Sequence, residues 1–296
     1  MKQIDKNVHR AEFDIYTNQY LHDAQTDQGD FYPKLSLKES YYDGFSERKY
    51  KTRNITPSAF NGWLDVLMRE QEEEGICRCC YCMRELKGNE ISVEHLIPES
   101  FEGLDSEEEY KFYCKYAPEL KRHVALGSTL DKISQRVKID ATQLKRKPHL
   151  IAHSNLFPAC NKEYGCSCNN DRHNFRILPL MLMQDVENWV RYKEDGKIII
   201  LHADFRSVKA TYENLQINRE TLVQIRHLWY LFSRKQIKPT AQNATDENQM
   251  KSFIEQAFDG NIEVKYQKYY NNEYYRQLIP QYNWFYTYYS NKYPLQ

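Results

Sequence analysis

The stretches that decide the fold are Cys77-Arg-Cys-Cys-Tyr-Cys82, Ile91-Ser-Val-Glu-His-Leu-Ile-Pro98 and Cys160-Asn-Lys-Glu-Tyr-Gly-Cys-Ser-Cys168. Seven of the eight cysteines lie in the first and third stretches, and scattered core thiols would not cluster in this way. The sequence shows no apolar segment typical of a secretory signal near its start, so a reducing, cytoplasmic location is expected. Clustered cysteines in such a compartment indicate metal ligands rather than disulfides.

A Cys-x-x-Cys pair is formed by Cys79 and Cys82, and a tight turn between such cysteines points both thiolates at one ion. Cys77 and Cys80 offer a second pair in another register, and Cys166 is a further candidate in the third stretch. Two pairs of thiolates this far apart in sequence would close a tetrahedral, structural zinc site that supplies folding energy. The expected ligands of Zn²⁺ are Cys79, Cys82, Cys160 and Cys168.

A second, catalytic site is predicted from residues that lie between and after the cysteines. Residues 91–98 predict a strand that ends at a proline, with Glu94 and His95 near its end. The stretch after the last cysteine predicts the start of a helix, on which Asn169 and His173 share one face. One carboxylate, one amide and one imidazole make an open site that suits Mg²⁺ or Mn²⁺ acting on phosphate. His95, next to the Glu94 ligand, would point away from the ion and deprotonate the attacking water.

The chain resembles the HNH endonuclease family, whose ββα-metal fold carries the same order of motifs: a cysteine pair, Glu-His, Asn-Leu, a cysteine, then Cys-Asn and a histidine. The first family histidine matches His95. The family asparagine matches Asn155, and the resemblance implies that it holds the imidazole of the base or the loop behind it. The last family position matches His173, Asn169 falls where many members place an extra metal ligand, and Glu94 takes the acidic position.

Within this family the chain is most similar to the HNH subunit of Septu anti-phage defence systems and to retron-associated HNH proteins, over roughly residues 60–235. Outside the motif the similarity is carried by Val190-Arg-Tyr, Asp195-Gly-Lys-Ile and Asn214-Leu-Gln-Ile-Asn218 with Leu222 and Arg226. The spacing between Cys160 and Cys168 is longer than in most zinc-bearing members. The resemblance implies antiviral defence, a nucleic-acid substrate with DNA expected before RNA, and an ABC-like ATPase partner. The sequence contains no G-x-x-x-x-G-K-[ST] loop, so ATP chemistry would sit on that partner.

The net charge and the hydropathy limit which binding partners are expected. Lys+Arg and Asp+Glu are both 41, so the formal net charge is zero, whereas a self-sufficient binder of nucleic acid usually has a positive excess. We therefore expect a partner to deliver the nuclease to its substrate, since a stand-alone restriction enzyme would need a basic recognition surface. No run approaches the ~18 apolar residues of a membrane span, and the mean hydropathy is −0.81, so no membrane partner is expected.

The predicted fold is α+β and mainly helical, with a zinc-pinned ββα-metal (HNH) module between helical flanks. The expected regions are 1–75, an arm and a helix from Thr56 to Gly75; 76–180, the nuclease module with a helical insertion at about 101–150; and 181–296, mostly helical with a tyrosine-rich tail. In the last region 218–232 has the period of an amphipathic helix, 185–192 is helix-like and 197–201 is strand-like. We expect the tyrosines of the tail to pack rather than to stack on bases.

The alternative function comes from another class: a zinc-stabilised interaction module whose nuclease site has decayed. The sequence speaks against decay because every expected catalytic position is intact: Glu94, His95, Asn155, Asn169 and His173. A purely structural zinc protein is a third possibility. Metal-dependent cleavage that is lost in His95→Ala with folding intact separates the nuclease from both.

Overall fold

The computed structural model describes residues 1–28, 45–46, 62–87, 91–97, 111, 114–115, 151–160, 168, 180–183, 186–201, 213 and 215–294. The strands are β1 (Glu72–Glu73), β2 (Ile76–Cys77), β3 (Ile91–His95), β4 (Leu156–Cys160), β5 (Val190–Tyr192) and β6 (Ile198–Ile200). The α-helices are α1 (Arg10–Gln28), α4 (Trp63–Glu70), α8 (Val186–Trp189), α10 (Glu220–Lys235), α11 (Glu247–Ala257), α12 (Lys268–Asn271), α13 (Glu273–Leu278) and α14 (Trp284–Lys292). Short 3-10 turns are η6 (His153–Asn155), η7 (Leu180–Leu182), η8 (Asn243–Thr245), η9 (Val264–Tyr266) and η10 (Ile279–Tyr282).

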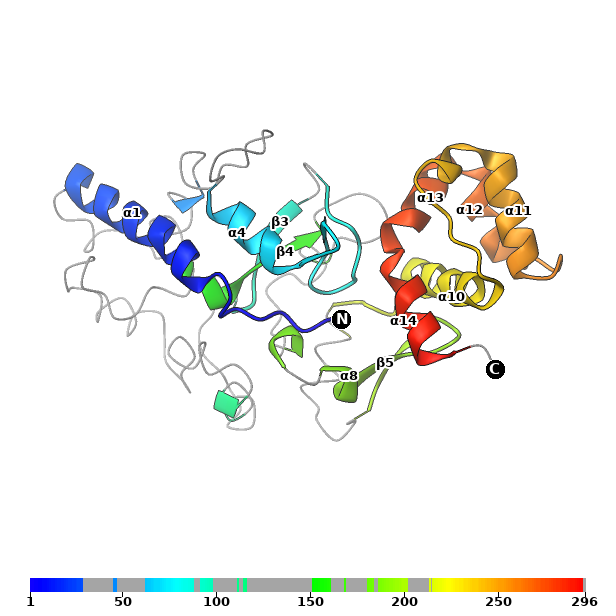
Figure 1. Cartoon of the computed structure of the whole chain (residues 1–296), viewed down its shortest axis with the longest axis horizontal. Helices are drawn as coiled ribbons and strands as arrows, with labels where there is room; N and C mark the ends of the chain where they lie inside the picture. Colours follow the sequence, from blue (N-terminus) through cyan, green and yellow to red (C-terminus); the bar gives the residue numbers. More distant parts are fainter. Residues whose placement is uncertain are drawn as a thin grey trace.

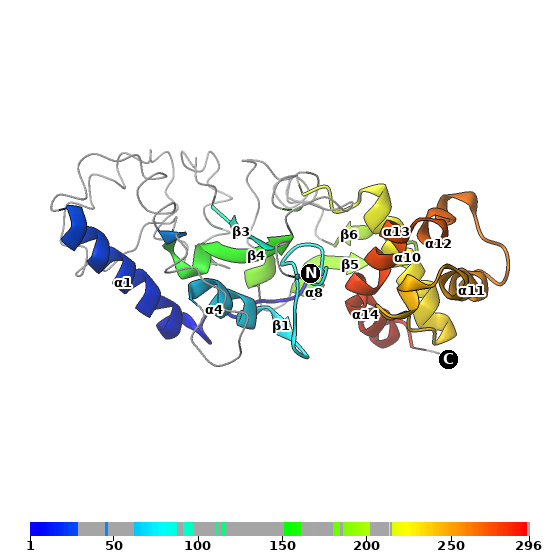
Figure 2. The same cartoon turned by 90° about the horizontal axis from the view of Figure 1, so that it is seen from above.

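These elements are strung along the long axis of the molecule (Figure 1). Helix α1 lies at one end and α10 to α14 gather at the other, with α4, β3 and β4 between them in both views (Figure 2). The predicted mixture of helices and small sheets is confirmed for the described residues. The helix expected after Cys168 lies outside them, as does nearly all of the insertion expected at 101–150. No helix in the described ranges is long and apolar enough to cross a membrane.

Strand β3 pairs with β4 in antiparallel register, with Ile91 opposite Cys160 and His95 opposite Leu156. The strand predicted at 91–98 is thereby confirmed, and it ends at His95. Every residue of β4, Leu-Phe-Pro-Ala-Cys, is buried, which is why this strand reads as a continuous apolar run. The pairing places Cys160, one of the expected zinc ligands, opposite the first residue of β3, while Glu94 and His95 lie at the other end of the strand.

Helix α4 confirms part of the helix that the sequence predicts between Thr56 and Gly75. Its buried face consists of Trp63, Leu64, Val66, Leu67 and Met68. The prediction that Gly75 ends this helix is wrong, because α4 ends at Glu70. Glu74 and Gly75 have φ angles of 54° and 77°, and two such left-handed residues in a row form the tight turn of a hairpin, here between β1 and β2. A glycine serves equally well at the end of a helix, so the local sequence did not separate the two uses.

The C-terminal unit, which we define as α10 to α14, has an aromatic core. The helix predicted at 218–232 is confirmed as α10, and its buried apolar residues are Leu222, Ile225, Leu228, Trp229 and Phe232. The tyrosines of the tail pack as expected, because four of them are at most 2% exposed: Tyr266, Tyr269, Tyr282 and Tyr289. The indole of Trp229 donates a hydrogen bond to the carbonyl of Ile279 at 3.0 Å. This bond ties η10 to the central helix of the unit.

The strand predicted at 197–201 is present as β6, which pairs with β5. The helical prediction for 185–192 is wrong at its end, since only α8 is helical and residues 190–192 pair with β6 instead. The turn between the strands requires Gly196, because a Cβ there would collide with the Val223 carbonyl oxygen of α10. Asn218 holds β6 in place: its side chain accepts from the Ile198 N–H at 2.7 Å and donates to the Ile198 carbonyl at 2.9 Å.

A buried ion network ties the N-terminal segment to α4 and β4. Lys6 Nζ donates to Glu70 Oε2 at 2.7 Å and to the Leu156 carbonyl at 2.8 Å. On the other side of the carboxylate, His153 Nε2 lies 2.5 Å from Glu70 Oε1. Burial would raise the pKa of Glu70, but the Lys6 ammonium and the His153 imidazole hold it below its usual range. The Glu70 carboxylate therefore joins Lys6 to the turn η6, and Lys6 in turn bonds to the start of β4.

Replacing Lys6 with methionine is expected to lower the free energy of unfolding by about 3–5 kcal/mol, because it leaves a buried carboxylate without its counter-charge. The Lys6 and Glu70 side chains are 3% and 0% exposed. The matched control is Lys2→Met, whose partner Glu73 lies 3.3 Å away with both side chains about two-fifths exposed. Such a surface pair contributes about 0–1 kcal/mol. Equal urea midpoints for the two variants would show that the buried network contributes no more to the free energy of unfolding than the surface pair does.

Acid pH is expected to destabilise the fold through His153. Burial lowers the pKa of His153 from its ordinary value of 6.5. Below about pH 6.5 the unfolded chain therefore binds a proton at this residue that the folded chain does not, so stability falls as the pH is lowered through that window. The check is the urea midpoint at about pH 7.5 and about pH 5.5, in the wild type and in His153→Gln. The variant should lose less stability between the two; an equal loss would exclude His153 as a source of the dependence.

Candidate metal centre and active site

Four buried cysteines converge on one point, and they are the four that the sequence predicts as zinc ligands. The sulfur atoms of Cys79, Cys82, Cys160 and Cys168 all lie within 4.8 Å of one another. None of the four side chains is more than 1% exposed. Sulfur atoms around a tetrahedral zinc, with bonds of about 2.3 Å, lie about 3.8 Å apart, and Cys82 Sγ and Cys160 Sγ are 3.8 Å apart. The cluster thus has the donor type and spacing to hold a metal ion such as zinc.

The loop between β2 and Leu86 shapes the first half of the cluster. The Cys79 N–H donates to the Arg84 carbonyl at 2.8 Å, and the Met83 N–H donates back to the Cys79 carbonyl at 3.1 Å. Met83 adopts a left-handed φ of 65°, which closes the turn that follows Cys82. A further bond joins the Leu86 N–H to the Cys77 carbonyl at 2.9 Å. The backbone therefore places the two thiol groups of the Cys-x-x-Cys pair together; this segment, residues 77–86, is called the knuckle below.

The neighbouring cysteines do not belong to the cluster. Cys77 and Cys80 are buried but lie outside the group of converging sulfur atoms, and Cys166 lies outside the described residues. Burial raises the pKa of Cys80 well above its usual value, and the adjacent Cys79 raises it further, so this thiol keeps its proton. Burial would also raise the pKa of Cys79, but hydrogen bonds from Cys160 and Cys168 hold it well below its usual value. The cluster thus favours a thiolate, which is the form that binds metal.

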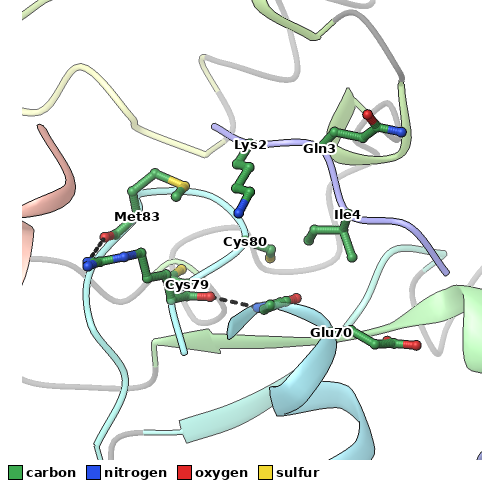
Figure 3. A pocket seen from close by; sticks show the side chains of 9 residues that line it. Lys2, Gln3, Ile4, Glu70, Cys79, Cys80 and Met83 are labelled. Carbon is green, nitrogen blue, oxygen red and sulfur yellow. Dashed lines mark hydrogen bonds between the residues drawn. The ribbon is translucent and has the colours of Figure 1, made fainter. Parts of the chain in front are cut away.

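The knuckle is fastened to its neighbours by Gln71, the residue that follows α4. Its amide nitrogen donates to the Arg78 carbonyl at 2.7 Å and to the Pro158 carbonyl of β4 at 2.9 Å. Gln71 and Arg78 also line a small cavity between the knuckle and residues 2–4 (Figure 3). Its volume of about 20 Å³ is room for about one water molecule. The cavity is therefore too small to be a substrate site.

The Glu-His pair ends β3, at the opposite end of the strand from Ile91, the partner of Cys160. Glu94 and His95 are consecutive residues of a strand, so their side chains point to opposite faces, as the sequence predicts for a ligand and a base. They are 2% and 6% exposed. Asn169 and His173, the other two predicted ligands of the catalytic cation, lie outside the described residues. Of the predicted hard-cation site, the structure therefore describes one ligand and the neighbouring base.

Asn155 clamps the segment that follows His95. Its Oδ1 accepts from the Ile97 N–H at 2.6 Å, and its Nδ2 donates to the Ile97 carbonyl at 3.1 Å. Its backbone carbonyl accepts from the Leu96 N–H at 2.9 Å. Asn155 itself is 0% exposed. Of the two roles that the family resemblance implies for this residue, these contacts correspond to holding the loop behind the histidine.

Sequence reasoning missed three residues that build the centre: Gln71, Arg84 and Tyr282. Arg84 is fully buried, and its Nε donates to Gln281 Oε1 at 2.6 Å. The Tyr282 hydroxyl lies 3.8 Å from Cys82 Sγ. An arginine after a cysteine pair ordinarily reads as a surface cation, and a tyrosine about 200 positions away carries no local sign of this contact. In the sequence, only the Cys-x-x-Cys motif indicates that further residues must complete the metal centre.

The comparisons with known proteins give no relative. No family model matches the chain, and no curated protein or solved structure is significantly similar to it.

Proposed function

We propose that the chain is a metal-dependent endonuclease of the HNH type that hydrolyses phosphodiester bonds in nucleic acid. The observation that carries the proposal is the Asn155 clamp, which sits directly behind the Glu94-His95 pair. It immobilises the backbone of residues 96–97, which directly follow β3. A fixed base and a fixed ligand at a strand end are what positioning of an attacking water requires.

In this proposal Glu94, Asn169 and His173 hold Mg²⁺ or Mn²⁺, and the four cysteines hold zinc as a structural pin. The bound hard cation would polarise the phosphate and stabilise the leaving oxygen. His95 accepts the proton of the attacking water at its imidazole, since it lies beside the ligand and faces the other way. Asn155 acts on the reaction only by holding the loop behind His95, so it is a positioning residue.

We further propose that a partner delivers this nuclease to its substrate. The formal net charge of zero supports this, because phosphate contacts alone would call for an excess of Lys and Arg. The resemblance to Septu and retron-associated HNH subunits makes an ABC-like ATPase the expected partner, DNA the first substrate to test, and antiviral defence in the cytoplasm the expected role. Activity in the isolated chain would then be low until the partner binds.

A second function is favoured by one observation, the burial of the proposed site. Glu94 and His95 are at most 6% exposed, whereas a nuclease must admit a phosphodiester to its metal. A zinc-stabilised interaction module with a decayed site would have no such requirement. The two functions differ in whether any phosphodiester bond is cut.

The test incubates the zinc-loaded full chain with supercoiled plasmid and, in parallel, with total RNA. Each substrate is given Mg²⁺, Mn²⁺ or EDTA, with and without an ABC-like ATPase of the kind that the resemblance implies as the partner. The proposal expects cleavage that needs the added cation, and stronger cleavage when the ATPase is present. Intact substrates in every lane, from protein that remains folded and zinc-loaded, would leave the interaction module as the better account.

A further inference from the structure

The C-terminal unit reaches the metal cluster through three consecutive residues, Gln281, Tyr282 and Asn283. The Gln281 carbonyl accepts from the Glu85 N–H at 2.8 Å, and its side chain accepts from Arg84 Nε at 2.6 Å. The Asn283 side chain accepts from the guanidinium of Arg78 at 2.8 Å. Residues 281–283 thus contact the knuckle on both sides of its Cys-x-x-Cys pair, with the side-chain bonds spanning 197 and 205 positions in sequence.

Tyr282 occupies the centre of this contact and points at a predicted zinc ligand. Its side chain is 0% exposed, and its hydroxyl lies 3.8 Å from Cys82 Sγ, within the range of a hydrogen bond to sulfur. A phenol is a good donor and a metal-bound thiolate is a good acceptor, so this contact is strongest when the cluster is charged. Donors of this kind next to metal ligands commonly change metal affinity by about 10–100-fold.

The same residue is built into the core of the C-terminal unit. The Tyr282 ring stacks on Phe285 of α14, with centroids 6.4 Å apart and planes 27° apart. The turn η10, to which Tyr282 belongs, packs against α10 and is bonded to Trp229 through Ile279. A displacement of the knuckle would therefore move side chains that the unit keeps fully buried.

We propose that Tyr282 is an outer donor of the zinc centre, and that metal binding by the knuckle and docking of the C-terminal unit stabilise each other. The Tyr282 hydroxyl donates to the Cys82 thiolate, while Arg78 and Arg84 hold residues 281–283 against the loop. Linkage then requires reciprocity: zinc strengthens the docking, and the docked unit strengthens zinc binding by the same factor. This inference rests on the four-cysteine metal centre and not on cleavage, so it stands or fails separately from the nuclease.

The first arm of the test measures zinc affinity of the full chain by competition with a chromogenic chelator. Tyr282→Phe removes the donor and keeps the ring, and it is expected to lower zinc affinity about 10-fold. The matched control is Tyr286→Phe, a tyrosine of the same unit whose ring packs on Trp229 rather than on the knuckle. The control should bind zinc as the wild type does. Equal affinities of the two variants would overturn the role of Tyr282.

The second arm uses the unsubstituted chain and follows amide hydrogen exchange across residues 279–289. Removing zinc with a chelator is expected to speed exchange in this segment and in the knuckle together. Exchange that rises in the knuckle alone would overturn the coupling. A wild-type chain that binds no zinc would overturn the whole inference, whatever its nuclease assay shows.

Discussion

Cys160→Ser is expected to abolish zinc binding and to remove most of the stability of the fold around β3 and β4. Cys160 is fully buried, ends β4 opposite Ile91, and contributes one of the four converging sulfur atoms. A structural zinc site contributes roughly 10–16 kcal/mol of apparent binding free energy, which is comparable to the roughly 5–15 kcal/mol that stabilises a whole domain. Metal content and thermal unfolding, measured on the same preparation, give the result.

The matched control is Cys80→Ser, which changes a buried cysteine of the same knuckle that lies outside the cluster. It should retain about one zinc per chain and lose only about 0.5–3 kcal/mol, the usual range for a single buried substitution. If Cys80→Ser loses the metal and Cys160→Ser keeps it, the ligand assignment is wrong. If both variants keep the metal, zinc is bound elsewhere in the chain.

His95→Gln is expected to lower the rate of metal-dependent cleavage by about 10²–10⁴-fold, the usual contribution of a general base. Glutamine fills nearly the same space in β3 and can donate and accept hydrogen bonds, but it cannot take up the proton of the attacking water. Zinc content and the thermal unfolding midpoint should stay close to those of the wild type. The rate is measured as single-turnover cleavage of whichever nucleic acid the wild type cuts.

The control for His95→Gln is Ser92→Ala, on the same strand. The Ser92 hydroxyl makes a long bond of 3.4 Å to the Ala159 carbonyl and has no assigned part in the reaction. Its rate should match that of the wild type. Equal cleavage by His95→Gln and Ser92→Ala would contradict the assignment of the base, whereas an equal loss in both would point to damage to β3 itself.

The sequence predicted the four cysteines whose sulfur atoms converge, because clustered cysteines with Cys-x-x-Cys spacing are a local signal of a metal site. A Cys-x-x-Cys turn brings two thiols to one point, and both Cys79 with Cys82 and Cys77 with Cys80 have this spacing. The exclusion of Cys77 and Cys80 could not be predicted, since their separation is the same and only the fold decides which sulfur atoms meet. The structure decides it through the knuckle bonds between Cys79 and Arg84.

Features that depend on long-range contacts escaped prediction. In the buried ion network Lys6 and Glu70 are 64 positions apart, and Glu70 and His153 are 83 apart. Tyr282 and Cys82 are 200 positions apart. Polar residues of this kind are ordinarily expected at the surface. The strand at 190–192 was missed for a related reason. Its pairing with β6 across the Gly196 turn outweighed the helical pattern of the preceding residues.

The central claim is that the chain holds a catalytic hard cation as well as a structural zinc ion, and its most direct test is Mn²⁺ binding to the zinc-loaded chain. Binding is followed by electron paramagnetic resonance in the wild type and in Glu94→Gln. We predict about one tightly bound Mn²⁺ per wild-type chain, and binding weakened about 10-fold or more when the Glu94 carboxylate is lost. Zinc should remain in both. A wild-type chain that holds zinc, binds no Mn²⁺ and cuts no nucleic acid would contradict the nuclease and identify a zinc-stabilised interaction module instead.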